Sequence, residues 1–175
     1  GSEIFRGPLI HAQKWPKDLD FHGKNIAVIG SGATAVTLVP ELSKKAKKVI
    51  MIQRSPTYIA SWPGEDWFAN ILRKIFPARF VSFIMKAKYN IFQQFIYYFS
   101  QKTPDKAKSF LLNRLRKEVG PDIDVEKHFV PDYNPWDQRL CLAKDGDFFK
   151  VLKDGKASIV TDHIDSFYEN GIKLK

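Results

Sequence analysis

The chain has 175 residues, of which 44% are hydrophobic and 27% are charged, and its formal net charge is +9. This length and composition fit one ordinary globular domain and exclude a disordered tail and a fibrous repeat. The single cysteine, Cys141, excludes a disulfide framework and a multi-cysteine metal site within the chain.

The first 55 residues divide into an irregular lead-in and a strand–helix–strand unit. Residues 1–23 show no persistent helical or alternating period, because glycine and proline interrupt them. The apolar run Ile26–Ile29 predicts a strand buried on both faces. We expect a helix from about Ala33 to Ala46 and a second buried strand over Val49–Ile52.

A glycine-rich turn joins the first strand to the helix. Gly30 permits the tight turn, Gly32 lets a pyrophosphate approach the backbone, and the small Ala35 allows close helix–strand packing. The helix N-terminus then offers free amides to the phosphates. Such glycines also occur in turns without a ligand, but the flanking strands favour a dinucleotide site. The six residues that match the pattern G-x-G-x-x-G/A are Gly30, Ser31, Gly32, Ala33, Thr34 and Ala35.

The end of the second strand indicates which dinucleotide is bound. An NAD site places Asp or Glu there to bind the ribose 2′-hydroxyl. This strand ends instead in Gln53-Arg54-Ser55, without an acid. Arg54 can pair with a 2′-phosphate and Ser55 can add a donor, so NADP(H) is favoured over NAD. The alternative is that Arg54 is only a solvated charge.

Residues 64–120 differ from their surroundings in composition. Apolar side chains recur at helical spacing, with breaks at Pro77, Pro104 and Gly120, so we expect a mainly helical segment. Between Trp67 and Glu118 there are eleven Lys or Arg and two acids, an excess equal to the whole net charge of +9. Eleven of the chain's 24 aromatic residues lie between Trp67 and Phe99.

The last part of the chain returns to strands. Residues 121–147 are predicted to be irregular, and a short helix is expected at Asp147–Leu152. A strand follows at Ala157–Val160, and Ile164–Tyr168 is expected to pair with Ile172–Leu174. No apolar run long enough to span a membrane and no leader occurs, so we expect a cytoplasmic protein. Gly1-Ser2 is typical of a cleaved tag.

The lead-in carries a family fingerprint. The run from Phe5 to Pro16 matches F-x-G-x-x-x-H-x-x-x-W-[PD] through Phe5, Gly7, His11 and Trp15. With the glycine turn and Gln53-Arg54-Ser55 after it, the chain resembles the Baeyer–Villiger and flavin-containing monooxygenases (class B flavoprotein monooxygenases). The resemblance covers nearly the whole chain and is closest to the bacterial branch that oxidises ketones and activates thioamide drugs.

The resemblance implies an α/β fold in which a Rossmann-like NADP-binding domain (24–63 and 121–175) carries a mainly helical insertion (64–120). Residues 1–23 would be an interdomain lead-in. The intact enzyme would use FAD and NADPH to oxygenate ketones or soft heteroatoms through a flavin C4a-peroxide. The family's FAD-binding glycine motif would precede residue 1, so this fragment alone is expected to be inactive. Its partners would be the FAD-binding domain of the same parent chain and a small-molecule substrate.

Two residue roles follow from the resemblance. Arg139 aligns with the arginine that these enzymes keep close to the flavin, where its charge favours the deprotonated peroxide. Gln138 stands where many relatives have a lysine that holds the 2′-phosphate, and this departure leaves more of that phosphate to Arg54. The role of His11 would be structural and positional. The alternative for Arg139 is a salt-bridged loop residue.

Parts of the sequence are also compatible with other functions. The basic aromatic segment could bind anionic lipid or nucleic acid, although in the resembling family it packs on the flavin domain. Nucleic acid is not expected as a partner. Peripheral contact of this segment with a membrane is possible but less favoured than packing on the flavin domain. A plain dehydrogenase is disfavoured because no Tyr-x-x-x-Lys pair occurs. His22, His128 and His163 lack metal-ligand spacing and are expected at the surface or in caps, so no metal site is predicted.

Overall fold

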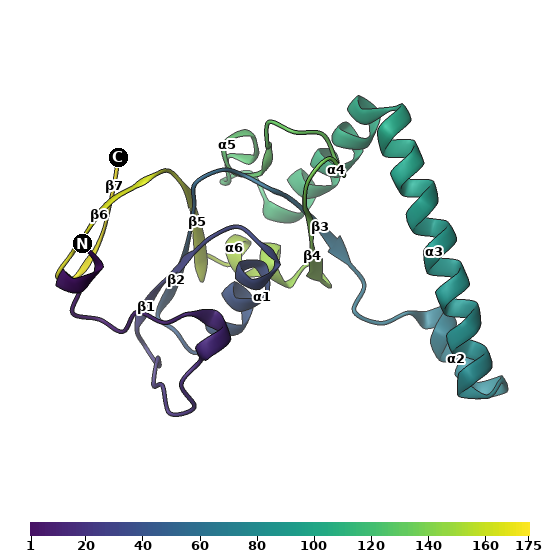
Figure 1. Ribbon diagram of the computed structural model, residues 1–175, viewed down its shortest axis with the longest axis horizontal. Coiled ribbons are helices and arrows are strands. Elements are labelled where there is room, and N and C mark those ends of the chain that lie inside the picture. The colour runs from purple at the N-terminus through teal and green to yellow at the C-terminus, as the bar shows by residue number, and fades with distance from the viewer.

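The centre of the molecule is a three-stranded parallel sheet. The computed structural model describes residues 1–175, and its sheet has the order β1 (Asn25–Ile29), β2 (Lys48–Gln53) and β5 (Ala157–Thr161). In the register of the sheet, Ile26 pairs with Val49 and Met51 pairs with Ile159. The helix α1 (Ala33–Leu42) connects β1 to β2 (Figure 1). The predicted α/β fold is therefore confirmed.

A second pair of parallel strands lies beside this unit. β3 (Tyr58–Trp62) pairs with β4 (Leu140–Lys144). The short helix α5 (Val125–Phe129) precedes β4, and α6 (Asp147–Lys153) follows it. The prediction that residues 121–147 are irregular was thus wrong, because α5 and β4 lie within them, and β3 was not predicted at all.

One hydrophobic core joins these elements. It holds nineteen buried apolar residues, drawn from α1, α4, α5, α6 and the neighbouring strands, and Val39, Phe129 and Phe148 are completely buried. β2 is the buried central strand, as expected. The expectation for β1 was wrong: it is an edge strand of alternating exposure, and Ile29 is 50% exposed.

The two ends of the chain meet at a small antiparallel hairpin. β6 (Ile164–Tyr168) pairs with β7 (Gly171–Leu174), which confirms the predicted hairpin. The backbone N–H of Arg6 donates to the carbonyl of Glu169 over 2.9 Å, and the side chains of these two residues form a salt bridge. Figure 1 shows both termini here, with the 3₁₀ helix Ser2–Ile4 against the hairpin.

The long connection between β3 and β4 contains three helices that precede α5. α2 (Trp67–Ile75) and α3 (Ala78–Lys102) form a hairpin, which we call the α2–α3 arm, and it extends from one side of the molecule (Figure 1). α4 (Pro104–Val119) returns to the core and buries Leu112, Leu115 and Val119 there. The predicted breaks at Pro77, Pro104 and Gly120 coincide with the ends of these helices. No helix of the chain is apolar and long enough to cross a membrane.

The carboxylate of Asp66 joins the two helices of the arm. Its Oδ1 accepts hydrogen bonds from the amides of Phe68 and Ala69 and so caps α2. Its Oδ2 accepts from Lys88 Nζ and Tyr89 Oη on α3, each over 2.6 Å. These bonds, chiefly the one from Lys88, hold the pKa of Asp66 well below its usual range, and the same contact raises the pKa of Tyr89.

The contribution of this contact to the free energy of unfolding should therefore depend on pH, and a substitution at Asp66 should reveal it. A carboxylate with a lowered pKa stabilises the fold above its unfolded pKa, and this stability is lost as the pH falls through the folded pKa. We expect Asp66→Asn, which keeps the cap, to unfold more easily than the wild type at pH 7. The difference should narrow below about pH 4. Asp66→Ala should cost about 0.5–2 kcal/mol more, because the cap is lost too. Urea unfolding across the pH range measures both, and a pH-independent difference would contradict the role of the ion pair.

Candidate functional site

The glycine turn between β1 and α1 leaves open space above it. Gly30 has a φ of +124°, a conformation that side chains rarely adopt, and its N–H donates to the Ile52 carbonyl at the end of β2. Gly32 is the N-cap of α1 and supplies no side-chain cap. A Cβ built on Gly30 or Gly32 would meet no atom within 4 Å. The first amides of α1 therefore face a space that a phosphate could enter.

This space belongs to a cavity of about 490 Å³ at the carboxyl ends of the parallel strands. Ligands of open α/β sheets bind in this position. Two arginines from distant parts of the chain meet in the cavity: Arg54 follows β2, and Arg139 precedes β4. Three of the eleven residues that line the cavity are hydrophobic. The other eight are Gly30, Ser31, Gly32, Arg54, Ser55, Arg139, Asp162 and His163.

The loop that carries the glycines is held from below. The Ser31 hydroxyl donates to the Ser55 carbonyl over 3.3 Å, which connects the glycine turn to the loop after β2. The Cys141 thiol donates to the Ser31 carbonyl over 3.7 Å. Burial raises the pKa of Cys141, although the charge of Arg139 acts in the opposite direction. Cys141 is thus a buried core residue.

The structure separates the remaining predicted cofactor residues. Ala35 is buried against the strands, while Ala33 and Thr34 lie exposed in the first turn of α1. Gln138 is exposed and does not line the cavity. Gln53 was expected to touch the cofactor, but its side chain is buried and lies outside the cavity lining. A contact between Gln53 and a cofactor therefore stays a prediction.

Gln53 belongs to a buried polar cluster below the cavity. Its Nε2 donates to the His128 carbonyl over 2.7 Å and to the Thr161 hydroxyl over 2.8 Å. The His128 imidazole, expected at the surface, is half-buried, and its Nδ1 lies 2.7 Å from the same hydroxyl. Burial lowers the pKa of His128. Gln53 Oε1 is the one buried side-chain atom without a hydrogen-bond partner.

Two cavity residues, Asp162 and His163, were missed as site residues. They follow β5, and the Asp162 amide donates to the Gln53 carbonyl over 2.9 Å. The signal was available, because the carboxyl ends of parallel strands meet at one edge and β5 was predicted. His163 was predicted only as a surface or capping residue, and its side chain is indeed exposed.

The fingerprint residues of the lead-in lie elsewhere. The ring of Phe5 packs edge-on against Phe167 of the hairpin, and Trp15 packs edge-on against Phe21. His11 Nδ1 accepts from the Gln13 amide over 3.3 Å. A Cβ on Gly7 would come within 2.7 Å of the Phe5 ring, so a larger residue there would displace that ring. None of the four lines the cavity.

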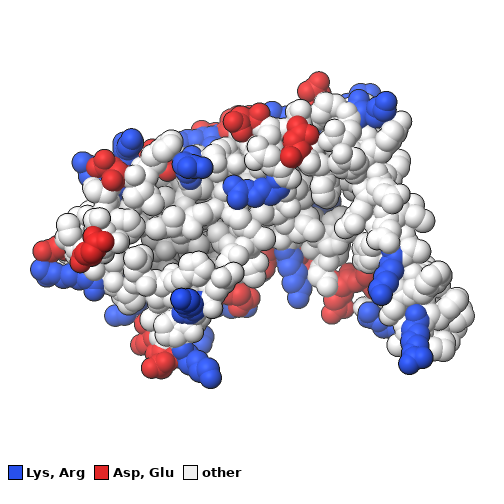
Figure 2. All heavy atoms as spheres, in the orientation of Figure 1, with Lys and Arg blue, Asp and Glu red and all other residues white.

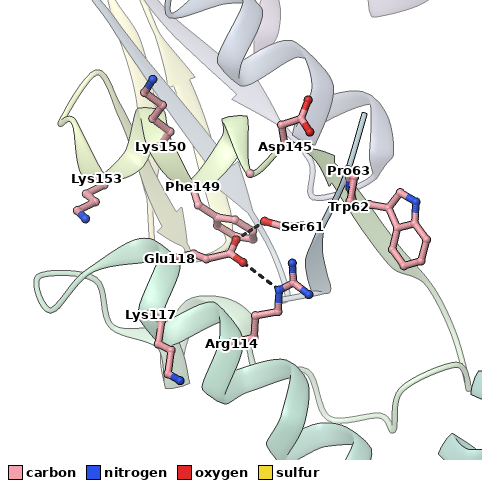
Figure 3. A pocket seen from close by; sticks show the side chains of 11 residues that line it. Ser61, Trp62, Pro63, Arg114, Lys117, Glu118, Asp145, Phe149, Lys150 and Lys153 are labelled. Atoms are coloured by element: carbon pink, nitrogen blue, oxygen red, sulfur yellow. Dashed lines mark hydrogen bonds and ion pairs between the residues drawn. The ribbon is translucent and has the colours of Figure 1, made fainter. Parts of the chain in front are cut away.

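A second cavity of about 510 Å³ lies between α4, α6 and the ends of β3 and β4. Figure 3 shows that its lysines point away from one another, whereas Glu118 faces Ser61 and Arg114 and bonds to both. Three ammonium groups that diverge do not make an anion site. We therefore assign no ligand to this cavity.

Comparisons with known proteins identify the family to which this chain is related. A family model described as FMO-like, flavin-binding monooxygenase-like, matches residues 1–117. The probable FAD-binding monooxygenase AlmA of Acinetobacter baylyi is 48% identical over 174 residues, which are 99% of this chain and 35% of AlmA. The FAD-containing monooxygenase EthA of Mycobacterium tuberculosis is 48% identical over 175 residues, 99% of this chain and 36% of EthA. The chain thus spans about a third of the length of these relatives.

Two solved structures share the fold. An oxidized steroid monooxygenase bound to NADP matches with a TM-score of 0.74 and 17% identity, over 100% of this chain and 40% of that one. A complex of OTEMO with FAD and NADP matches with a TM-score of 0.73 and 19% identity, over 99% of this chain and 41% of that one. At these identities the likeness establishes the fold alone.

The two glycines of the turn should respond differently to substitution. Gly30→Ala forces a side chain into a positive φ, so we expect it to lose about 1–3 kcal/mol of stability. Gly32 has a φ of −80° and no close neighbour, so Gly32→Ala should fold normally. Its methyl group should nevertheless obstruct the predicted pyrophosphate and weaken dinucleotide binding. Thermal unfolding without ligand and calorimetric titration with NADPH separate the two effects. Equal stability of both variants would contradict the strained turn.

Proposed function

Because this chain belongs to the flavin-binding monooxygenase-like family, we propose that it is the NADPH-binding portion of a longer FAD- and NADPH-dependent monooxygenase. In this proposal residues 24–63 and 121–175 form the dinucleotide-binding domain, and residues 64–120 are its helical insertion. Residues 1–23 connect it to the rest of the parent chain. The relatives match 99% of this chain and are almost three times as long. This supports the proposal that the chain is part of a larger enzyme.

The observation that carries the proposal is the cavity at the glycine turn. Its open glycine backbone and the uncapped start of α1 suit a pyrophosphate. Arg54 stands at the end of β2, where an NAD site would have an acid. A guanidinium there can bind the 2′-phosphate that distinguishes NADPH from NADH.

FAD is the second cofactor of the proposed enzyme, and it would be held by the FAD-binding domain of the same parent chain. The pattern G-x-G-x-x-G/A after a strand occurs once in this chain, at Gly30–Ala35, and NADPH would occupy that turn. Bound FAD would supply the redox and oxygen chemistry that side chains lack. The substrate class in this proposal is a small ketone or a soft heteroatom compound.

The residues of this chain would then have three tasks. Gly30–Ala35 hold the pyrophosphate, Arg54 and Ser55 hold the 2′-phosphate, and Arg139 supplies a positive charge that cannot be lost by deprotonation. Arg139 is exposed on the cavity edge, so its guanidinium can face a group outside this chain. We propose that it faces the flavin and is the catalytic residue of this portion.

The proposed role of Arg54 predicts a preference for NADPH over NADH. A hydrogen bond to a charged group contributes about 1.5–3 kcal/mol, so Arg54→Ala should weaken NADPH binding roughly 10- to 150-fold. Binding of NADH should change little. Calorimetric titration of the intact enzyme with both cofactors measures this, and Arg73→Ala on α2, which also removes one arginine, is the matched control. A wild-type enzyme that binds both cofactors equally would refute the assignment.

The proposed role of Arg139 predicts a different defect. Loss of one preorganised charge from a reacting site costs about 2.7–4 kcal/mol, so Arg139→Ala should form product roughly a hundred- to a thousandfold more slowly. NADPH affinity should fall less than in Arg54→Ala. Rapid mixing of the intact enzyme, with flavin reduction and product formation followed separately, distinguishes the two steps. If Arg139→Ala instead lost affinity for NADPH as severely as Arg54→Ala, Arg139 would be a phosphate ligand.

A further inference from the structure

The Tyr133 side chain connects the two loops that carry the arginines of the cavity. Its hydroxyl oxygen lies 2.9 Å from the hydroxyl oxygen of Thr57 and 3.2 Å from the carbonyl oxygen of Arg139. Thr57 directly precedes β3 and follows Arg54 by three residues, and Arg139 directly precedes β4. Because β3 and β4 are paired parallel strands, their first residues lie side by side. One side chain therefore bridges the starts of both strands.

The direction of these two hydrogen bonds follows from their chemistry. A carbonyl oxygen only accepts, so the Tyr133 hydroxyl donates its single proton to Arg139. The Thr57 hydroxyl must then donate to the Tyr133 oxygen. Thr57 is completely buried, and a buried hydroxyl without a partner would cost free energy. The donors therefore run from the start of β3, through Tyr133, to the backbone of Arg139.

Tyr133 is itself held in place by Tyr58 of β3. The Tyr58 hydroxyl donates to the Tyr133 carbonyl over 3.0 Å, and the two rings pack edge to face with their centroids 5.6 Å apart. Tyr58 is 2% exposed, and burial raises its pKa to about 12, so its hydroxyl keeps its proton. The backbone and the ring of Tyr133 are thus fixed without any contribution from its own hydroxyl.

The loop between Tyr133 and Arg139 is strained. Trp136 has a φ of +73°, which residues other than glycine rarely adopt. The Asp137 amide donates to the Asn134 carbonyl across this turn over 3.1 Å. A strained turn persists only where the surrounding contacts hold it, and such turns concentrate at active sites. The bond from the Tyr133 hydroxyl to Arg139 is a contact that joins the two ends of this loop.

The electrostatic effect of Arg139 depends on where its guanidinium lies. The side chain is exposed at the cavity edge, so its position depends on its backbone. On the face that Figure 2 shows, basic and acidic side chains are interspersed over the body of the molecule and form no single basic patch. A diffuse positive field therefore does not replace one charge at a reacting group. A shift of the Arg139 backbone would move this charge, and its Coulomb energy falls with distance.

We propose that Tyr133 is a positioning residue for Arg139. Its hydroxyl holds the Arg139 backbone beside the start of β3, so that the guanidinium meets the flavin in one arrangement. This inference rests on the proposed function of Arg139. Arg54 has a support of its own, because the Ser31 hydroxyl donates to the Ser55 carbonyl. Loss of the Tyr133 hydroxyl should therefore affect oxygenation more than the binding of NADPH.

The test uses the intact enzyme that contains this segment. Tyr133→Phe removes the hydroxyl but keeps the ring and the carbonyl that Tyr58 holds, so the thermal midpoint should stay close to that of the wild type. Rapid mixing should show product formation roughly 2- to 12-fold slower, the range for one neutral hydrogen bond, with flavin reduction and NADPH affinity nearly unchanged. Tyr89→Phe, which removes a hydrogen-bonded tyrosine hydroxyl in the α2–α3 arm, is the matched control and should form product at the wild-type rate.

A double-mutant cycle with Arg139→Ala identifies the cause of the slowing. If Tyr133 acts through the guanidinium, Tyr133→Phe should slow product formation no further in the Arg139→Ala enzyme. Equal slowing in both backgrounds, or no slowing in Tyr133→Phe alone, would overturn the positioning role and leave the function of Arg139 intact. A lower thermal midpoint with an equal loss of flavin reduction would show a merely structural role and would also overturn it. If Arg139→Ala itself forms product at the wild-type rate, the proposed function of Arg139 is wrong and the positioning role falls with it.

Discussion

The buried amide of Gln53 connects the three elements that position the candidate site. It lies at the end of the central strand β2, and its Nε2 bonds to the hydroxyl of Thr161 at the end of β5 and to the backbone of α5. Its own carbonyl accepts from the amide of Asp162. A buried amide that lost these partners would cost free energy, so the strand ends are held in one arrangement. Arg54 and Asp162, one residue beyond this cluster on either strand, enter the cavity from fixed positions.

The hydrogen bonds of Gln53 also separate what the sequence could predict from what it could not. The strand–helix–strand unit and its glycine turn could be predicted, because every contact that defines them lies within about thirty residues of chain. Gln53 was predicted to bind the cofactor because it belongs to the run Gln53-Arg54-Ser55 at the end of the second strand. Side chains alternate along a strand, so adjacent residues at a strand end can lie on opposite sides. Only the long-range partners Thr161 and His128 revealed which side Gln53 takes.

The missed pair β3–β4 has a related cause. About eighty residues separate Tyr58 from its partner Leu140, and the α2–α3 arm and α4 occupy most of that interval. Short strands of this kind carry a weak periodic signal, and their pairing is decided by distant chain. The error in β1 was of another kind. A continuous apolar run is typical of a strand covered on both faces, yet β1 borders the sheet with Ile29 half exposed. The presence of Arg54 and Arg139 in one cavity likewise depends on the position of β4, which the sequence did not predict.

The buried thiol of Cys141 also protects the glycine turn from chemical change. Oxidants attack the thiolate rather than the protonated thiol, and they must first reach the sulfur. Cys141 is buried beneath the glycine turn, its proton points at the Ser31 carbonyl, and burial raises its pKa. All three features keep the sulfur in its reduced form. An oxidised sulfur here would carry added oxygen atoms into the contact that supports Ser31, so the chemical inertness of this one side chain preserves the shape of the turn.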